Sequence, residues 1–346
     1  MRFHRVHIDA LAYELPSEVV TSRAIEGLLE PVYKAVRVAP GQIEALTGIT
    51  ERRWWPEGFK VTEGATRAAR KALEKSGIRG DQLDLIIYGG VCRDYFEPAT
   101  ACAIGAALGV SEHALLYDVS NACLGLLNGI IDCANRIELG QVRAGLVVAC
   151  ESARDINLDT VRRLLEHCDM EQFKTSFATF TGGSGAVAII LTDGSFADAP
   201  RRRLLGGVHR SAAAHHDLCR WGLRKSGSLF EQFLSTDASS VLKHGIALAS
   251  KTWHGLLDEL RWRAEDVDRV ICHQVGHAHQ QSLLKCLGLD PARELPSYAR
   301  LGNIGTVSLA LTAALAEEQD FLRPGHRVGL LGIGSGLNCM MLGVEW

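Results

Sequence analysis

The sequence contains an internal repeat with an interval of about 180 residues, and a chain with such a repeat folds into two similar halves. Asp84 in RGDQLDLIIYGGV matches Asp268 in RAEDVDRVICHQV, 184 positions later. Cys123 and Asn303 then open matching helical segments that lie 180 positions apart. Each half later ends on a strand that follows glycines, in GGSGAVAII and in GIGSGLNCMML. The repeat predicts two halves related by a pseudo-twofold axis, although ordinary strand–helix alternation remains an alternative explanation of the spacing.

Two segments of the repeat, 123–139 and 306–319, are apolar on nearly every side until their last turn. A helix of this kind is packed on all sides, in the centre of a protein. We expect the two helices to meet near the pseudo-twofold axis with their N-termini close together. Cys123 and Asn303 would then belong to one site.

The remaining pattern is that of an α/β protein. Five short apolar runs are typical of strands buried on both faces: 83–91, 144–152, 186–193, 267–275 and 327–334. The segment from Thr62 to Lys75 has the periodicity of an amphipathic helix, and the glycine at position 77 marks its end.

The repeat divides the chain into residues 1–200, which carry the cysteine, and residues 201–346, which carry a histidine and Asn303. Two stretches fit neither repeat unit. We interpret 153–180 as an inserted helix with a loop, and 201–221 as a linker that enters the second half. The three arginines at its start have the composition of a solvated linker, which is a better explanation than a phosphate contact.

Composition excludes several classes of protein. The chain has 346 residues, of which 47% are hydrophobic and 22% charged, so it is neither disordered nor a disulfide-stapled miniprotein. A net charge of −3 provides no basic surface for nucleic acid. No apolar run is long enough for a membrane span, and the N-terminal residues lack the layout of a signal peptide. We therefore expect a cytoplasmic protein whose ten cysteines are reduced.

Cys123 is the candidate nucleophile. It lies in DVSNACLGLLNG, where a strand gives way to the apolar helix. The N–H groups and the dipole at a helix N-terminus stabilise a thiolate, so we expect the thiol pKa to be lowered. Gly125 allows a substrate to approach closely. The other cysteines in apolar patterns are expected to be small core residues.

His273 and Asn303 are the candidate partners of the cysteine. His273 follows an apolar strand in VICHQVGHAH, and Asn303 lies between two glycines in LGNIGTVS. An asparagine amide donates hydrogen bonds to a developing oxyanion, although a helix N-cap is an alternative role for Asn303. His273, His277 and His279 also have a spacing that could bind a metal, but no carboxylate or cysteine completes a ligand set, so we expect no metal.

Motifs of other enzyme classes are missing from the sequence. The glycines of GIGSG, at 332–336, do not match the dinucleotide-binding fingerprint, and no strand–helix unit follows them. The chain has no P-loop and no G-x-S-x-G motif. These absences leave hydride transfer, phosphoryl transfer and serine hydrolysis without their usual support.

Four motifs together resemble the thiolase superfamily, in particular the condensing enzymes related to 3-oxoacyl-ACP synthase III. They are NACLGLLNG around Cys123, HQV at His273, GNIG at Asn303 and the terminal GIGSGLN, and they occur in the order found in the family. The resemblance covers essentially the whole chain, including TGITERRWW at 47–55. It implies a thiolase-like five-layered αβαβα fold of two pseudo-symmetric halves, and a homodimer.

Within that superfamily the chain most resembles the acyl-CoA-condensing thiolases of bacterial long-chain olefin biosynthesis. VCRDYFEPATA at 91–101, DVSNACL and LLGIGSGLNC carry this resemblance. It implies that Glu97 is a base delivered to the partner subunit, whereas without the family Glu97 is a loop carboxylate. The chain reads HQVG where synthase III enzymes usually read HQAN, which argues against a housekeeping role in fatty-acid synthesis.

The resemblance implies a non-decarboxylative Claisen condensation of two long-chain acyl-CoAs through an acyl-cysteine. The substrates are coenzyme A thioesters and no separate cofactor is implied. The backbone N–H groups of Cys123 and Ser335 would hold the oxyanion. Arg52, Arg53 and Trp54 would contact CoA, unless they form only a surface strand end. Downstream biosynthetic enzymes are possible partners.

Three alternatives remain open. The same cysteine, histidine and asparagine could serve a decarboxylative condensation with a malonyl donor, or acyl transfer to another acceptor. A non-catalytic acyl-binding partner protein would have no need of all three residues. A metal-binding protein built on the histidines is the most distant alternative.

Overall fold

The computed structural model describes residues 1–196, 202–226 and 229–346. Its main feature is one nine-stranded sheet with the order β11-β12-β13-β8-β1-β7-β6-β4-β5. The strands of the first half are β1 (His7–Glu14), β4 (Leu85–Tyr88), β5 (Leu115–Asp118), β6 (Ala144–Glu151) and β7 (Gly185–Thr192). Those of the second half are β8 (Arg202–Ser211), β11 (Arg269–Cys272), β12 (Arg327–Gly334) and β13 (Asn338–Glu345).

The two halves of this sheet have the same topology, so the predicted repeat is confirmed. In the first half β4 runs parallel to β5 and β6, β6 pairs antiparallel with β7, and β7 pairs antiparallel with β1. In the second half β11 runs parallel to β12, β12 pairs antiparallel with β13, and β13 with β8. A parallel bridge between Val270 and Glu294 occupies the place of the β4–β5 pair. The halves join where His7 and Ile8 pair with Arg203 and Arg202.

The matching aspartates have the same structural role. Asp84 accepts a hydrogen bond of 2.7 Å from the N–H of Arg143, just before β6. Asp268 accepts one of 2.8 Å from the N–H of Arg327, at the start of β12. Each carboxylate therefore holds the strand that lies next to its own.

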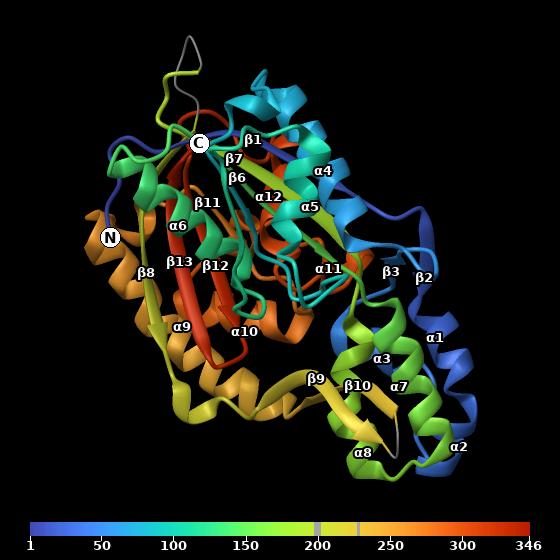
Figure 1. Ribbon diagram of the computed structural model, residues 1–346. Coiled ribbons are helices and arrows are strands. Elements are labelled where there is room, and N and C mark those ends of the chain that lie inside the picture. The colour runs from blue at the N-terminus through green and yellow to red at the C-terminus, as the bar shows by residue number, and fades with distance from the viewer. Residues whose placement is uncertain (197–201, 227–228) are drawn as a thin grey trace.

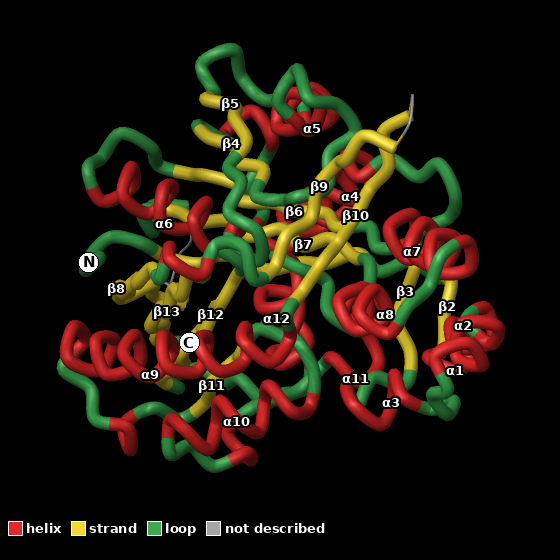
Figure 2. The backbone as a smooth tube through the Cα atoms, turned by 90° about the horizontal axis from the view of Figure 1, so that it is seen from below, coloured by secondary structure: helices red, strands yellow, loops and turns green. Residues whose placement is uncertain are grey.

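The two halves of the sheet form separate layers, and helices alternate with them in five layers (Figures 1 and 2). The central layer consists of α6 (Gly125–Glu138) and α12 (Val307–Glu318). Outside the first half lie α4 (Val61–Ser76) and α5 (Thr100–Leu108), and outside the second half lie α9 (Ala238–Leu260) and α10 (His277–Leu287). Figure 2 shows α9 and α10 on the opposite side of the molecule from α4 and α5. This arrangement agrees with the predicted αβαβα fold.

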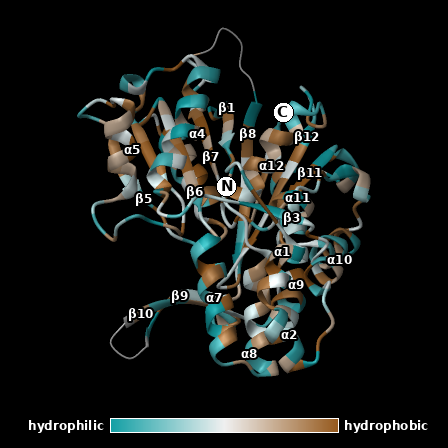
Figure 3. Ribbon diagram, turned by 90° about the vertical axis from the view of Figure 1, so that its right-hand side faces the viewer, coloured by the Kyte–Doolittle hydropathy of each residue, from teal (hydrophilic) through white to brown (hydrophobic). Residues whose placement is uncertain are grey.

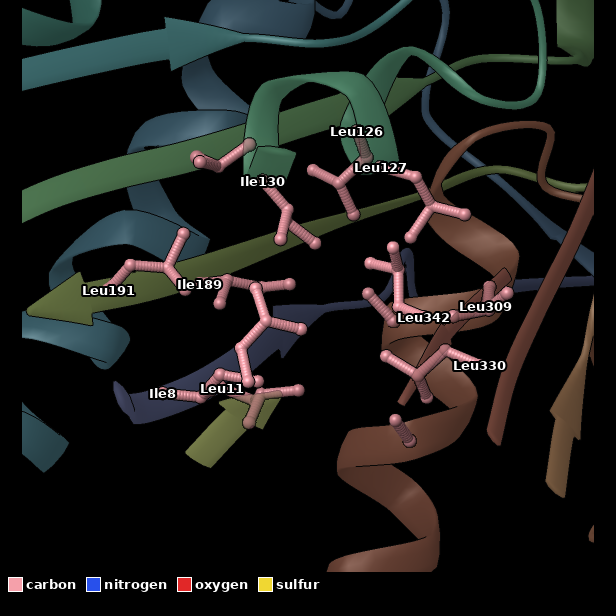
Figure 4. Packing of buried hydrophobic residues seen from close by; sticks show 14 of the residues in the cluster. Ile8, Leu11, Leu126, Leu127, Ile130, Ile189, Leu191, Leu309, Leu330 and Leu342 are labelled. Atoms are coloured by element: carbon pink, nitrogen blue, oxygen red, sulfur yellow. The ribbon is translucent and has the colours of Figure 1, made fainter. Parts of the chain in front are cut away.

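The central layer explains the unusual composition of its helices. One buried cluster joins α6 and α12 to the inner faces of both halves, with Leu126, Ile130, Leu309, Ile189 and Leu342 among its members (Figure 4). Because side chains cover α12 on every side, the helix needs no polar face until its end. Figure 3 shows the same distribution, with largely hydrophobic strands in the interior.

A smaller helical region lies beside the main sheet (Figures 1 and 3). Its own buried cluster includes Ile25, Tyr33, Trp54, Leu164 and Phe173. Its helices and strands are β2 (Glu18–Thr21), α1 (Ser22–Leu28), α2 (Glu30–Val36), α3 (Gln42–Thr47), β3 (Glu51–Trp54), α7 (Arg154–Glu166), α8 (Met170–Ser176), β9 (Cys219–Ser226) and β10 (Leu229–Thr236). The short α11 (Tyr298–Leu301) precedes α12.

Two interpretations of the chain need correction. The stretch 201–221 is not a linker, because its residues 202–211 form β8, which pairs with both β13 and β1 in the middle of the sheet. Arg202 pairs with Glu317, and Arg203 lies 3.4 Å from Glu345, while residue 201 lies outside the described residues. The insertion at 153–180 contains two helices rather than one. The division at residues 200 and 201 stays a prediction.

None of the helices in the three described stretches combines the length and the apolar character needed to cross a membrane.

Candidate active site

Cys123 lies on the connection between β5 and α6, two residues before the helix begins at Gly125. Ala122, directly before it, has a φ of 44°, a conformation that costs a non-glycine residue energy and that is often found at functional sites. The end of β12 lies against the cysteine, since a Cβ added to Gly334 would stand 3.4 Å from the Cys123 nitrogen. The backbone of Ser335 follows Gly334 directly, beside the nucleophile.

The predicted lowering of the Cys123 pKa is wrong. Burial, together with smaller effects of the nearby Cys219 and the Glu151 carboxylate, raises the pKa of the Cys123 thiol to about 12. Removal of the sulfur from water disfavours the thiolate more than the helix N-terminus favours it. At neutral pH Cys123 is therefore a neutral thiol, and its proton must leave during the reaction.

His273 directly follows β11, and its N–H donates a 3.0 Å hydrogen bond to the carbonyl of Leu331 in β12. Leu331 is three residues before Gly334, which lies against Cys123, so β12 links the two candidate residues across roughly 10 Å of strand. The imidazole is buried, and burial, with a smaller effect of His279, lowers the pKa of His273 to about 3. His273 is therefore a neutral imidazole with one N–H to donate.

Asn303 is held on both sides by the main chain. Its N–H donates to the carbonyl of Thr181 at 2.8 Å, and its carbonyl accepts from Gly183 at 2.9 Å. Its side-chain Oδ1 accepts a 3.0 Å hydrogen bond from the N–H of Gly305. Since the oxygen is engaged, the amide NH₂ remains to donate. The alternative that Asn303 caps α12 is wrong, because Thr306 is the N-cap residue.

The N-termini of the two central helices meet, as the repeat predicted. The N–H of Leu126 in α6 donates a 2.7 Å hydrogen bond to the hydroxyl of Thr306, the residue directly before α12. Asn338 in β13 donates to Asn121 at 3.2 Å, which ties the turn before Cys123 to the other half. The structure therefore brings the Cys123 and Asn303 turns together, one from each half of the repeat.

Glu97, unlike these residues, is exposed to solvent. It belongs to an exposed loop between β4 and α5. In the described part of the chain Glu97 forms no hydrogen bond or ion pair. Tyr95 and Phe96 beside it are 61% and 91% exposed, which is unusual for such large apolar side chains. Within one protomer this loop points an apolar and acidic tip into solvent.

The three residues predicted to contact CoA all lie on β3, but their side chains differ in burial. Arg52 is fully buried, and its guanidinium donates hydrogen bonds to the carbonyls of Val20 and Phe180 and to the hydroxyl of Ser22. Trp54 is also buried. The prediction of CoA contacts is wrong for these two side chains, because neither reaches the surface. Arg53 is half-buried, and its contact with CoA stays a prediction.

A cleft of about 580 Å³ lies between α3, α8 and the start of α9. Its apolar lining includes Leu46, Met170 and Phe177. Thr236 also lines it and donates a 3.4 Å hydrogen bond to the sulfur of Cys219, the thiol that raises the pKa of Cys123.

Comparison with known proteins decides the family. An acyl-CoA:acyl-CoA alkyltransferase from Shewanella oneidensis is 54% identical over the full length of both chains. The chain belongs to the acyl-CoA:acyl-CoA alkyltransferase family. A second alkyltransferase of this name, from Xanthomonas campestris, is 36% identical, again over the full length of both chains. This family member is an acyltransferase, as the resemblance implied.

Family models and solved structures agree with this assignment. Residues 47–198 match the thiolase N-terminal domain, and residues 257–346 match the C-terminal domain of 3-oxoacyl-[acyl-carrier-protein] synthase III. Cerulenin-bound Xanthomonas campestris OleA superimposes with a TM-score of 0.94 at 35% identity, covering 100% of this chain and 98% of that one. A variant of the same enzyme with bound lauric acid and lauroyl-CoA gives 0.93 at 34% identity, covering 99% and 100%. The thiolase-like fold is therefore confirmed for this alkyltransferase.

One buried residue of the alkyltransferase escaped prediction from its sequence. Glu151 ends the apolar strand β6, is 4% exposed, and lies close enough to Cys123 to raise its pKa. A single acidic residue at a strand end carries no signal of burial in a sequence. Only the packing of β6 against loops from both halves reveals it.

The histidine spacing does not form a metal site in the described residues, where no three His, Cys, Asp or Glu side chains are grouped to hold an ion. His277 lies 3.3 Å from the hydroxyl of Tyr298 through its Nδ1, and His279 is buried beside His273.

Proposed function

We propose that this chain condenses two long-chain fatty acyl-CoA molecules, without decarboxylation, to a 2-alkyl-3-oxoacyl product. The observation that carries the proposal is its 54% identity, over the full length, to an enzyme named acyl-CoA:acyl-CoA alkyltransferase. The similar enzyme crystallised with lauroyl-CoA supports a fatty acyl thioester as substrate. The arrangement of Cys123, His273 and Asn303 supplies the chemistry for it.

In the first step Cys123 attacks the thioester carbonyl of one acyl-CoA. A bond forms between its sulfur and the acyl carbon, and the bond to the CoA sulfur breaks. The thiol proton of Cys123 passes to the departing CoA thiolate, so the step is neutral overall even though the Cys123 pKa is about 12. The backbone N–H groups of Cys123 and Ser335 stabilise the oxyanion that forms in between.

In the second step a second acyl-CoA loses an α-proton to the carboxylate of Glu97. His273, neutral because of its burial, and the amide of Asn303 donate hydrogen bonds to the thioester oxygen, on which the negative charge develops. The carbanion attacks the acyl-cysteine carbon and the Cys123 sulfur leaves. The proton held by Glu97 returns to that sulfur, and the enzyme is ready for another cycle.

Glu97 acts in the active site of the partner subunit of a homodimer. Three features support this part of the proposal. Glu97 lies on an exposed loop, it has no partner in the described part of its own chain, and large apolar side chains flank it. Burial of Tyr95 and Phe96 against a second copy would remove them from water and carry the carboxylate with them.

We further propose that the enzyme works in the cytoplasm, where acyl-CoA substrates and reduced cysteines occur together. All ten cysteines are free in the structure, consistent with a reducing compartment. The reaction uses its two thioesters without a further cofactor, and enzymes that consume the 3-oxoacyl product follow it.

Condensation with a malonyl donor is the second candidate function. It is supported by relatives named beta-ketoacyl-[acyl-carrier-protein] synthase III, such as that of Rhodospirillum rubrum, at 28% identity over 87% of this chain. The lower identity and shorter coverage make it the weaker candidate. Such a reaction releases carbon dioxide to form the carbanion and needs no base such as Glu97.

The test is incubation of the protein with one long-chain acyl-CoA and no malonyl donor, followed by mass spectrometry of the products. We expect a 3-oxoacyl product with two acyl chains, or the ketone left after its spontaneous decarboxylation. An acylated Cys123 without condensed product would refute the proposal and direct the search to malonyl donors or other acceptors.

A further inference from the structure

Glu151 is a buried carboxylate that the mechanism above does not use. Its Oε1 accepts a 2.8 Å hydrogen bond from the N–H of Val91, and its Oε2 accepts one of 3.1 Å from the N–H of Cys92. A carboxylate is costly in the interior unless its oxygens are hydrogen-bonded: burial raises the pKa of Glu151, and these two donors offset that effect in part. The same two bonds fix the first residues of the loop 91–99, which carries Glu97.

The Glu151 side chain also lies against the turn that carries Asn303. A Cβ added to Gly305 would stand 3.5 Å from Cγ of Glu151 and 3.7 Å from its Oε1. Gly305 in turn donates its N–H to the side chain of Asn303. Because α12 begins at Val307, the carboxylate is close to a helix N-terminus, whose dipole favours a negative charge.

The internal repeat explains why the strand end occupies this place. Gly334 at the end of β12 lies against Cys123, at the entrance to α6. Glu151 at the end of β6 lies against Gly305, at the entrance to α12. Each half thus places the end of one strand against the turn that precedes the central helix of the other half. The strand of the first half ends there on a glutamate, and that of the second half ends on a glycine.

The loop 91–99 is anchored at its root and free at its tip. Glu151 holds its first two residues, and Asp94 accepts hydrogen bonds of 2.8 and 3.1 Å from two N–H groups at the start of α4. Residues 95–97 that follow are exposed. The direction in which Glu97 projects is therefore set by the anchored root.

We propose that Glu151 is a positioning residue for the condensation step, which ties the Glu97 loop to the Asn303 turn of the same protomer. A protomer then presents Glu97 to its partner in one orientation. This inference rests on the proposed function, in which Glu97 is the base in the partner's site. It predicts that Glu151 acts on the site of the partner and not mainly on the site of its own protomer.

The test uses a mixed dimer with a single working site. One protomer, the loop donor, carries Cys123→Ala, and the other, the cysteine holder, carries Glu97→Ala; two affinity tags isolate the mixed dimer. Glu151→Gln keeps the shape of the side chain but replaces one acceptor oxygen with an NH₂ group. It is introduced into the loop donor or into the cysteine holder. Condensation of a long-chain acyl-CoA is then measured per acylated Cys123.

We expect Glu151→Gln in the loop donor to slow condensation at least tenfold, and at least fivefold more than the same change in the cysteine holder. An equal loss in both positions, or a larger loss in the cysteine holder, would overturn the inference, since Glu151 would then act on its own site. If the mixed dimer without Glu151→Gln forms no product, delivery of Glu97 from the partner is wrong, and the inference is overturned with it.

Hydrogen exchange provides a readout that does not depend on activity. In the Glu151→Gln homodimer we expect the amides of Val91 and Cys92 to exchange at least tenfold faster, while those of β6 keep the wild-type rate. Asp84→Asn is the matched control, because Asp84 accepts two main-chain N–H bonds at the other end of β6. It should leave the loop and the condensation rate unchanged. Wild-type exchange of the Val91 and Cys92 amides in Glu151→Gln would show that no such tether exists.

Discussion

Gly125 begins α6 two residues after the nucleophile, and the structure leaves no room for a side chain there. A Cβ added to Gly125 would stand 2.1 Å from the carbonyl oxygen of Gly89, which belongs to the main chain and cannot rotate away. Normal contact requires a shift of at least about 1 Å between the first turn of α6 and the end of β4. For Gly125→Ala we expect a loss of about 2–3 kcal/mol in the free energy of unfolding, the upper range for overpacking.

The same shift moves Cys123 relative to the Ser335 and Asn303 backbones. A misplacement of this size costs roughly a hundredfold in rate, so acylation of Cys123 by a long-chain acyl-CoA should slow by about that factor. Urea denaturation measures the stability, and mass spectrometry of the intact protein measures acylation with time.

Gly27→Ala is the matched control. Gly27 lies within α1, and an added Cβ there meets no atom within 4 Å. This variant should gain about 0.5–1 kcal/mol from the lower backbone entropy of its unfolded chain, and acylate at the wild-type rate. A Gly125→Ala protein with wild-type stability and wild-type acylation would refute the reasoning, since the main-chain contact would then be absent.

Four further predictions follow from the site. Cys123→Ala should abolish acyl-enzyme formation, whereas Glu97→Ala should still form the acyl-enzyme and condense at least a hundredfold more slowly. Mass spectrometry of protein and products distinguishes the two variants. Condensation by Glu97→Ala at the wild-type rate would exclude Glu97 as the base. Because the Cys123 pKa is about 12, alkylation of this thiol by iodoacetamide should rise about tenfold per pH unit from pH 7 to 9, and a plateau in that range would contradict the raised pKa. Burial lowers the pKa of His273 to about 3 and that of His279 to about 4. Below pH 6.5, the ordinary pKa of a histidine, these two side chains therefore take up protons in the unfolded chain but not in the folded one. Stability should therefore fall as the pH drops from 6.5 toward 4, by about 2 kcal/mol per histidine at pH 5, and a urea midpoint that is constant over this range would count against both shifts. Arg52→Met should lose about 2–4 kcal/mol of stability because it leaves buried acceptors unpaired, with no change in KM for acyl-CoA; a raised KM in a fully folded variant would restore Arg52 as a substrate contact.

The repeat and the central helices were predictable because they depend on patterns that a sequence carries directly. Apolar residues on every side of 306–319 indicate a helix that is buried wherever it lies, and the matched positions of Cys123 and Asn303 indicate that two such helices meet. The error at 201–221 has a physical cause. Arginines and glycines in β8 have a composition typical of a loop, and only pairing with β13 and β1 on its two sides makes this segment a strand of the sheet.

The sequence by itself determined the two-half architecture and the family, because hydrophobic periodicity and motif order are local properties of a chain; the same motifs predict Cys123, His273 and Asn303 as the catalytic residues. Tertiary structure alone decided which charged and titratable groups are removed from water. Burial took Arg52 out of reach of a substrate, enclosed Glu151 between two loops, and raised the pKa of Cys123 that its helix was expected to lower. Desolvation depends on atoms from segments far apart in the chain, such as β6, β9 and the loop after β4, so its effect appears only once those segments are packed together.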